Sequence, residues 1–149
     1  MKKQKSIGNK GFSLVELIIV IAIMAILIGV MAPQLMKYVE RSRVSADTQV
    51  ADTVRTAIMT AMLDPTVDDG STPTAGGAEA NITTIASTDG KKFSKLVEEI
   101  LGDTTANVSK KLKSKAYKDQ PIMYQVTSTN QVIVTITSKD TTVANLEIK

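Results

Sequence analysis

The feature that most constrains this chain is an apolar run near its N-terminus, residues 12–32, in which only Ser13 and Glu16 are polar. As a helix this run is about 31 Å long at about 1.5 Å per residue, close to the roughly 30 Å hydrocarbon core of a bilayer. The run is too long and too apolar for an ordinary helix of a small soluble domain. We therefore expect a membrane-spanning helix.

Glu16 is unusual in such a helix. An ionised carboxylate in the apolar layer costs at least about 2.5 kcal/mol on insertion scales, so it usually marks a partner or a function. The next downstream cation is Lys37, about 31 Å further along the helix. We expect Glu16 to find a partner outside its own segment. The alternative is an acid held at the headgroup level of a plain anchor.

The flanking charges give the helix a direction. Residues 1–11 contain no acid and four lysines, so the N-terminus is expected on the cytoplasmic side. A secretory signal peptide has a similar start, and the small residues of Gly29–Ala32 leave room for its cleavage site, but Gly11 before the run argues against it. Without residues 1–11 the chain has 14 basic and 15 acidic residues, a net charge of −1. The basic pI is therefore no argument for nucleic acid binding.

Together these features resemble the precursor of a type IV pilin with a short leader. The matching residues are the basic leader 1–11 ending in Gly11, then Phe12, Glu16, the apolar helix 12–33 and Pro33. The resemblance implies that a prepilin peptidase cuts after Gly11 and methylates the new amino group of Phe12. It also implies that Glu16 meets the Phe12 amino group of a neighbouring subunit, and that the helices pack together in a filament core. Such a salt bridge sets registry only when its geometry is good.

Pro33 and Gly29 mark a weak point of the helix. Proline lacks the N–H group that would bond the carbonyl of Gly29, and glycine itself weakens a helix. We expect a bend or a locally loosened turn between these two residues.

Beyond Pro33 the pattern becomes that of a globular domain, residues 34–149. Residues 34–63 are expected to form an amphipathic helix, because apolar residues recur at helical spacing and Asp64-Pro65 ends the pattern. Residues 64–90 are rich in Gly, Pro, Ser, Thr and Asp and are expected to form an exposed loop, and residues 90–102 a short helix capped by Asp89 or Ser94 and ended by Gly102. The apolar positions of residues 34–63 are Leu35, Val39, Val50, Val54, Ile58 and Met62.

Residues 121–149 alternate apolar and polar side chains, so three antiparallel strands over 122–128, 131–138 and 142–148 are expected. The breaks at Thr129-Asn130 and Lys139-Asp140 are short enough for hairpins. One face of this sheet is expected to cover the apolar stripe of the long helix. The fold class is therefore α+β, the layout of a pilin.

The composition does not favour an enzymatic function. The chain has no cysteine and no histidine, so it lacks a thiol nucleophile and an imidazole base, and no catalytic residue or cofactor is expected. Asp68 and Asp69 are adjacent acids without further ligands, which favours solvated side chains over a metal site. Many pilins close their C-terminal region with a disulfide; its absence here favours a compartment that does not rely on disulfides, such as a Gram-positive surface.

A run of lysines beside Tyr117 is the remaining charged feature. Clustered ammonium groups raise the local positive potential and attract polyanions such as DNA, teichoic acid or polysaccharide. The favoured interpretation is a solvated face that pairs with acids of neighbouring subunits, with nucleic acid as the less favoured partner. The run consists of Lys110, Lys111, Lys113, Lys115 and Lys118.

The resemblance implies a structural subunit of a type IV pilus, held in the cytoplasmic membrane as a precursor and found in a surface filament once assembled. The filament would support adhesion, aggregation or surface motility. Its partners would be other copies of the chain, the prepilin peptidase, the assembly platform membrane protein and minor pilins. Two alternatives stay open: a pseudopilin of a type II secretion or DNA-uptake system, and an uncut membrane-anchored binding module.

Overall fold

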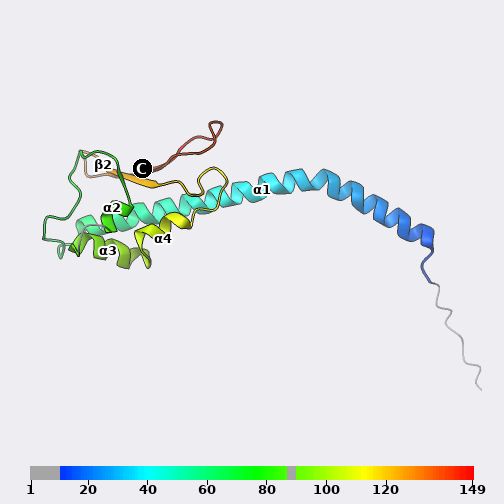
Figure 1. The fold of residues 1–149 in the computed structure, drawn as a ribbon, viewed down its shortest axis with the longest axis horizontal. Coiled ribbons are helices and arrows are strands. Elements are labelled where there is room, and N and C mark those ends of the chain that lie inside the picture. The colour runs from blue at the N-terminus through cyan, green and yellow to red at the C-terminus, as the bar shows by residue number, and fades with distance from the viewer. Residues whose placement is uncertain (1–10, 87–89) are drawn as a thin grey trace, which may run out of the picture. The chain divides into compact units, whose positions relative to one another are not determined.

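The computed structural model describes residues 11–86 and 90–149 of the chain. It is an α+β structure with the element order α1, β1, α2, α3, α4, β2, β3, β4 (Figure 1). The chain divides into two compact units, Met1–Tyr38 and Val39–Lys149, and α1 belongs to both. The leader lysines Lys2, Lys3, Lys5 and Lys10, and the candidate cap Asp89, lie outside the described residues.

The first element is one long helix, α1, Leu14–Leu63. It ends at the residue expected from Asp64-Pro65, because the residue before a proline is driven out of the helical region. It continues through Pro33, so helix is found where a loosened turn was expected. The bend itself stays a prediction.

In the second unit, α1 buries a stripe that begins later than the sequence predicted. Val54 and Ile58 are fully buried as expected, whereas Leu35 and Val39 are 62% and 40% exposed. Small residues complete the stripe, and they let other elements approach the helix closely. The buried residues of α1 are Asp47, Ala51, Val54, Ala57, Ile58 and Ala61.

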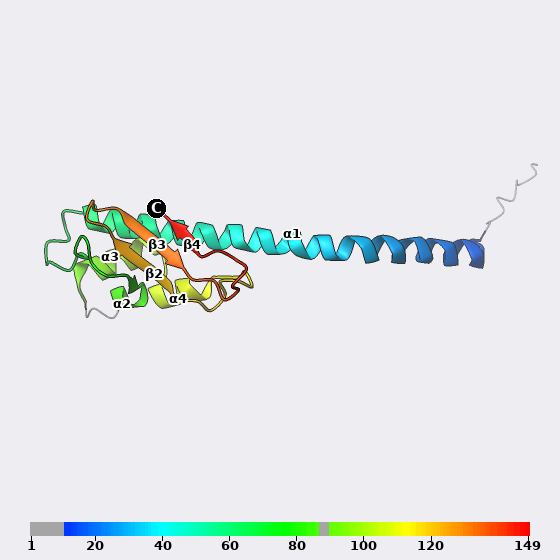
Figure 2. The same cartoon turned by 90° about the horizontal axis from the view of Figure 1, so that it is seen from above.

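The sheet is antiparallel, with the strand order β1-β2-β3-β4. It consists of β1 Ala80–Asn81, β2 Ile122–Val126, β3 Val132–Ile136 and β4 Leu146–Ile148. The strands run oblique to α1 (Figure 2). The expected alternation holds in β3, where Val132, Val134 and Ile136 are buried, and its register places Ile136 opposite Ile122. These side chains join the α1 stripe in one hydrophobic core.

The third expected strand, 142–148, is reduced to the three residues of β4. Before β4, side-chain oxygens accept hydrogen bonds from backbone N–H groups. The Ser138 N–H donates to Asn145 Oδ1 at 3.0 Å, and the Thr142 N–H donates to Asp140 Oδ1 at 2.9 Å. Such local bonds compete with the ladder of a sheet. The connection between β3 and β4 is consequently a loop and not a tight hairpin.

The segment 64–90, expected as an exposed loop, contains β1 and the short helix α2, Thr83–Ala86. Ile82 and Ile85 are buried in the core, so this segment adds a fourth strand and part of the hydrophobic interior. The expected short helix is α3, Lys92–Leu101, and Gly102 ends it in the left-handed region with φ 64°. A further helix, α4, Thr105–Lys110, was not expected.

Candidate functional site

The expected cleavage point lies ahead of the helix, in irregular backbone. Residues 11–13 are not helical, and the Phe12 side chain is 91% exposed. A Cβ atom placed on Gly11 would meet nothing within 4 Å. The fold of this chain therefore does not require glycine at position 11, and the reason for that residue must be sought in something that acts on the chain.

Glu16 has a hydrogen-bond partner within its own segment. The Ser13 backbone N–H donates to Oε2 of Glu16 at 3.2 Å, three residues back along the chain. Ser13 precedes α1, so this is the carboxylate half of a capping box, which satisfies one of the free N–H groups at a helix start. The expected partner outside the segment stays a prediction, and the structure adds a backbone donor upstream of Glu16.

The apolar part of α1 is uncovered within this chain. Every described residue of the first unit is exposed, and the helix contains a stretch of mean hydropathy 3.0, apolar and long enough to cross a membrane. Ile26, Ile28 and Met31 are 68%, 64% and 65% exposed. At about 25 cal/mol per Å² of apolar area, leaving this surface in water is strongly unfavourable, so lipid or other protein must cover it.

Gly29 lies on this uncovered helix. A Cβ atom at position 29 would also meet nothing within 4 Å. Glycine inside a helix costs about 1 kcal/mol relative to alanine, and no close contact among the described residues compensates for that cost. Small residues in apolar helices commonly allow close approach of another helix.

Comparison with known proteins identifies this segment. The prokaryotic N-terminal methylation motif matches residues 8–32, which include Gly11, Phe12, Glu16 and Gly29. The N-terminal segment of the chain is thus similar to that of type IV fimbrial proteins. Two proteins named type IV major fimbrial protein FimA, from Dichelobacter nodosus, are 46% and 47% identical to it over 56 residues, 38% of this chain. A fimbrial protein of Moraxella nonliquefaciens is 43% identical over 53 residues, 36% of this chain.

The match is confined to part of each pilin. The aligned residues make up 36%, 35% and 34% of these three relatives, so the chain spans about a third of their length. No solved structure matches the chain. The α+β fold expected from the pilin resemblance is nevertheless present, with the long helix packed on an antiparallel sheet.

The lysine run, the second predicted site, is held to α1 through its backbone. The N–H groups of Lys113 and Ser114 donate to Oδ1 and Oδ2 of Asp47 at 2.8 and 2.9 Å, and the Lys115 N–H donates to Glu40 Oε1. Glu40 and Asp47 are seven residues apart, two helical turns, and so share one face of α1. Asp47 is fully buried, which makes its two bonds the main support of the segment.

Along this segment, buried and exposed residues alternate. Leu112, Ser114 and Ala116 are buried, whereas Lys113, Lys115 and the other lysines are exposed. The Tyr117 ring is buried as well, and its hydroxyl donates to the Ala144 carbonyl at 2.7 Å. Burial of this ring raises the pKa of Tyr117. The apolar residues thus anchor the segment while the lysines face solvent.

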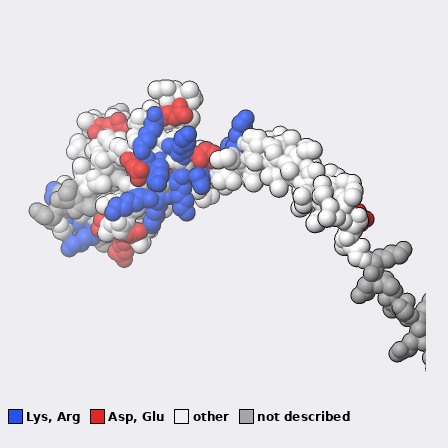
Figure 3. All heavy atoms as spheres, turned by 45° about the vertical axis from the view of Figure 1, so that its right-hand side comes forward, with Lys and Arg blue, Asp and Glu red and all other residues white. Residues whose placement is uncertain are grey.

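The structure brings four of the five predicted lysines together. Lys110, Lys113, Lys115 and Lys118 line a groove of about 540 Å³ with Leu112 and Arg43 of α1. Lysine and arginine side chains gather on this face of the globular unit (Figure 3). Lys111 instead pairs with Asp103 at 2.9 Å, and this pairing holds the pKa of Asp103 at about 2. Sequence reasoning missed Arg43, because only the structure shows that Asp47, four residues further along α1, bonds to the lysine segment.

The adjacent acids Asp68 and Asp69 are engaged with the start of α3. The Lys92 N–H donates to Asp69 Oδ2 at 2.9 Å, and the Lys92 ammonium bonds the Asp68 carboxylate. Bonds from the Ser71 hydroxyl and the Lys92 N–H lower the pKa of Asp69 to about 2. Asp69 therefore caps α3 from a distant loop, while Ser94, a predicted cap, donates its hydroxyl to the Lys91 carbonyl. Within residues 11–86 and 90–149, no group of three His, Cys, Asp or Glu side chains suits a metal ion.

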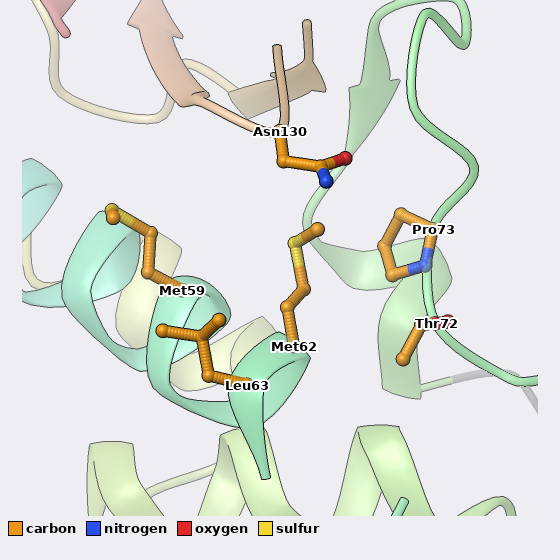
Figure 4. A pocket seen from close by; sticks show the side chains of 6 residues that line it. All are labelled: Met59, Met62, Leu63, Thr72, Pro73 and Asn130. Carbon is orange, nitrogen blue, oxygen red and sulfur yellow. The ribbon is translucent and has the colours of Figure 1, made fainter. Parts of the chain in front are cut away.

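A small hollow of about 260 Å³ lies at the end of α1 (Figure 4). Met59, Met62 and Leu63 line it from the helix, and Met62 points toward Asn130 and Pro73. The lining carries no charged side chain and no nucleophile other than the Thr72 hydroxyl. The hollow therefore offers apolar contact and no catalytic chemistry.

Proposed function

We propose that this chain is a structural subunit of a type IV pilus, made as a membrane-held precursor, cut after Gly11 and polymerised through α1. The observation that carries the proposal is the uncovered apolar helix behind a methylation motif. A bilayer would cover it in the precursor, and helices of other copies would cover it in the filament. The named relatives are fimbrial proteins, which agrees with a structural role and not an enzymatic one.

The cut would change the role of Glu16. Before cleavage, its carboxylate accepts the Ser13 N–H. Cleavage would create a cationic α-amino group on Phe12, which prepilin peptidase would then methylate, and a neighbouring copy would present that group to Glu16. An ion pair in an apolar filament core is favourable only with good geometry, so it would set the stagger between subunits. The platform protein and minor pilins would act in the same assembly step.

Two glycine variants separate processing from assembly. Gly11→Leu and Gly29→Leu each place their Cβ atom in open space, because a Cβ at either position has nothing within 4 Å. Intact-mass analysis of membranes and sheared fibres is the measurement. We expect Gly11→Leu to stay uncut, and Gly29→Leu to be cut at methylated Phe12 but to yield few fibres.

Three outcomes would contradict the proposal. An unsubstituted chain that keeps Met1 supports the uncut binding module. A chain that is cut but absent from surface fibres, with loss of secretion or DNA uptake on its deletion, supports the pseudopilin. If the Glu16→Ala variant formed as many fibres as the unsubstituted chain, Glu16 would not set the stagger between subunits.

A further inference from the structure

The groove lined by Arg43, Lys110, Lys113, Lys115 and Lys118, which we call the basic groove, has no role in the proposed filament core. We infer that the basic groove binds the phosphates of a linear phosphodiester polymer. This is a binding activity of the globular unit, and it does not depend on how the N-terminal helix assembles.

The acids close to the basic groove are already engaged. Asp47 accepts two backbone N–H groups and is fully buried, so its oxygens are not available to the lysine side chains. Glu40 accepts the Lys115 N–H and lies 3.6 Å from Arg43. Asp140 interacts electrostatically with Lys115, but its carboxylate is bonded to the N–H and hydroxyl of Thr142.

Four ammonium groups of the basic groove therefore remain available. Among the described residues, Lys110, Lys113, Lys115 and Lys118 form no ion pair, whereas the neighbouring Lys111 does. Like charges held close together repel one another, so the arrangement is unfavourable until an anion binds. The backbone bonds to α1 hold the segment in place without using the lysine side chains, so the main chain that carries the cations is fixed before binding.

Within residues 11–86 and 90–149, the free acids that a second copy could offer are scattered along the sequence. The exposed acids of the described residues that form no hydrogen bond or ion pair are Asp52 on α1, Glu79 before β1 and Glu99 on α3. These residues come from three separate parts of the chain, and none of them neighbours another in sequence. A row of cations needs a row of anions, and a phosphodiester chain supplies one charge per repeat.

The chemistry of the basic groove indicates which part of such a polymer it contacts. Its only aromatic neighbour in sequence, Tyr117, is 3% exposed and has its hydroxyl bonded to Ala144. None of the residues that line the basic groove is aromatic, so its lining offers no ring for base stacking, the usual means of holding single strands. Contact with phosphates alone fixes position but reads no sequence, so binding is expected to be sequence-independent.

The test uses the full chain in neutral detergent with two fluorescent probes, a 30-base-pair duplex DNA and poly(glycerol phosphate), and measures anisotropy from about 50 to 200 mM salt. The groove variant replaces Lys110, Lys113, Lys115 and Lys118 by Gln. The control variant replaces Lys37, Lys91, Lys95 and Lys149 by Gln, an equal loss of charge from exposed positions outside the lysine segment. Lysines of residues 1–11 contribute equally to all three proteins.

For DNA, each lost phosphate contact removes about 0.9 from the slope of log affinity against log salt. We expect the groove variant to lose up to about 3.6 from that slope and roughly tenfold or more in affinity at about 0.1 M salt, while the control variant changes little. Dependence on the groove lysines with either probe supports the inference, and the probe that binds more tightly identifies the source of the phosphodiester.

Equal binding by the groove variant and the unsubstituted chain with both probes would overturn the inference, as would an equal loss in the control variant. Salt-sensitive self-association that the groove variant alone abolishes, without polymer binding, would assign the basic groove to contacts between copies instead. Because the chain's cleavage and fibre formation are measured separately, failure here is distinct from failure of the proposed pilus function.

Discussion

Replacing Asp47 tests how the globular unit holds its lysine segment. Asp47 is fully buried on α1, and both carboxylate oxygens accept backbone N–H groups, from Lys113 at 2.8 Å and from Ser114 at 2.9 Å. The substitution Asp47→Ala removes both acceptors at once. Ser114 is itself fully buried, so water cannot replace the lost bond to its N–H without opening the structure.

The magnitude follows from these two bonds. A hydrogen bond to a charged group contributes about 1.5 to 3 kcal/mol, and a buried donor left without a partner costs about 1 to 3 kcal/mol. Relief of the carboxylate's own burial offsets part of the loss. We expect Asp47→Ala to lower the free energy of unfolding by about 3 to 5 kcal/mol. Asp47→Asn keeps one acceptor oxygen and is expected to cost about half as much.

Urea unfolding of the full chain in neutral detergent, followed by pulse proteolysis of the globular unit, measures this difference. The control is Asp52→Ala, an exposed acid five residues further along the same helix, for which a change within about 0.5 kcal/mol is expected. A loss below about 1 kcal/mol in Asp47→Ala, or an equal loss in Asp52→Ala, would refute the assignment of Asp47 as the main support of the segment.

Three further predictions concern stability, each read by urea or thermal unfolding of the same preparation. Gly102→Ala should cost about 1 to 2 kcal/mol from backbone strain alone, because φ is 64° and a Cβ has free space there; Gly102→Asn should cost less, and an equal cost would contradict this account. Ile58→Ala should cost about 2 to 5 kcal/mol, whereas Leu63→Ala, at an 80% exposed position, should be nearly neutral. Asp69 has its pKa lowered from 3.8 to about 2, so its contribution is complete above its unfolded-state pKa and is lost as pH falls toward 2. Asp69→Asn should therefore lose less stability over that interval than the unsubstituted chain, and parallel pH profiles would refute the capping role.

The parts of the fold that sequence predicted well depend on neighbouring residues. The end of α1 at Leu63 follows from the proline two residues later, and Gly102 is the left-handed residue that ends α3. β2 and β3 follow from alternation over five residues each, and a short turn sets their register. In each case the cause lies within a few residues of the effect.

The parts that were missed depend on residues far apart in sequence. Asp69 caps a helix that starts 23 residues later, and Asp47 binds an N–H group 66 residues away. Ile82 lies in a polar stretch that reads as loop, yet pairing of β1 with β2 places it in the core. For the candidate site, the motif predicted the N-terminal residues, but only the structure separates Lys111 from the lysines of the basic groove.

The bonds from α1 to the lysine segment end on main-chain N–H groups, which every amino acid except proline possesses. The side chains at positions 113 and 115 can consequently be exchanged. A glutamate, a serine or a threonine there would donate the same backbone hydrogen bonds to α1. Related chains with this layout can therefore vary the charge of the exposed face with little loss of folding stability. On such a surface, substitutions can change which ligands the exposed side chains bind without changing the hydrogen bonds that hold the backbone.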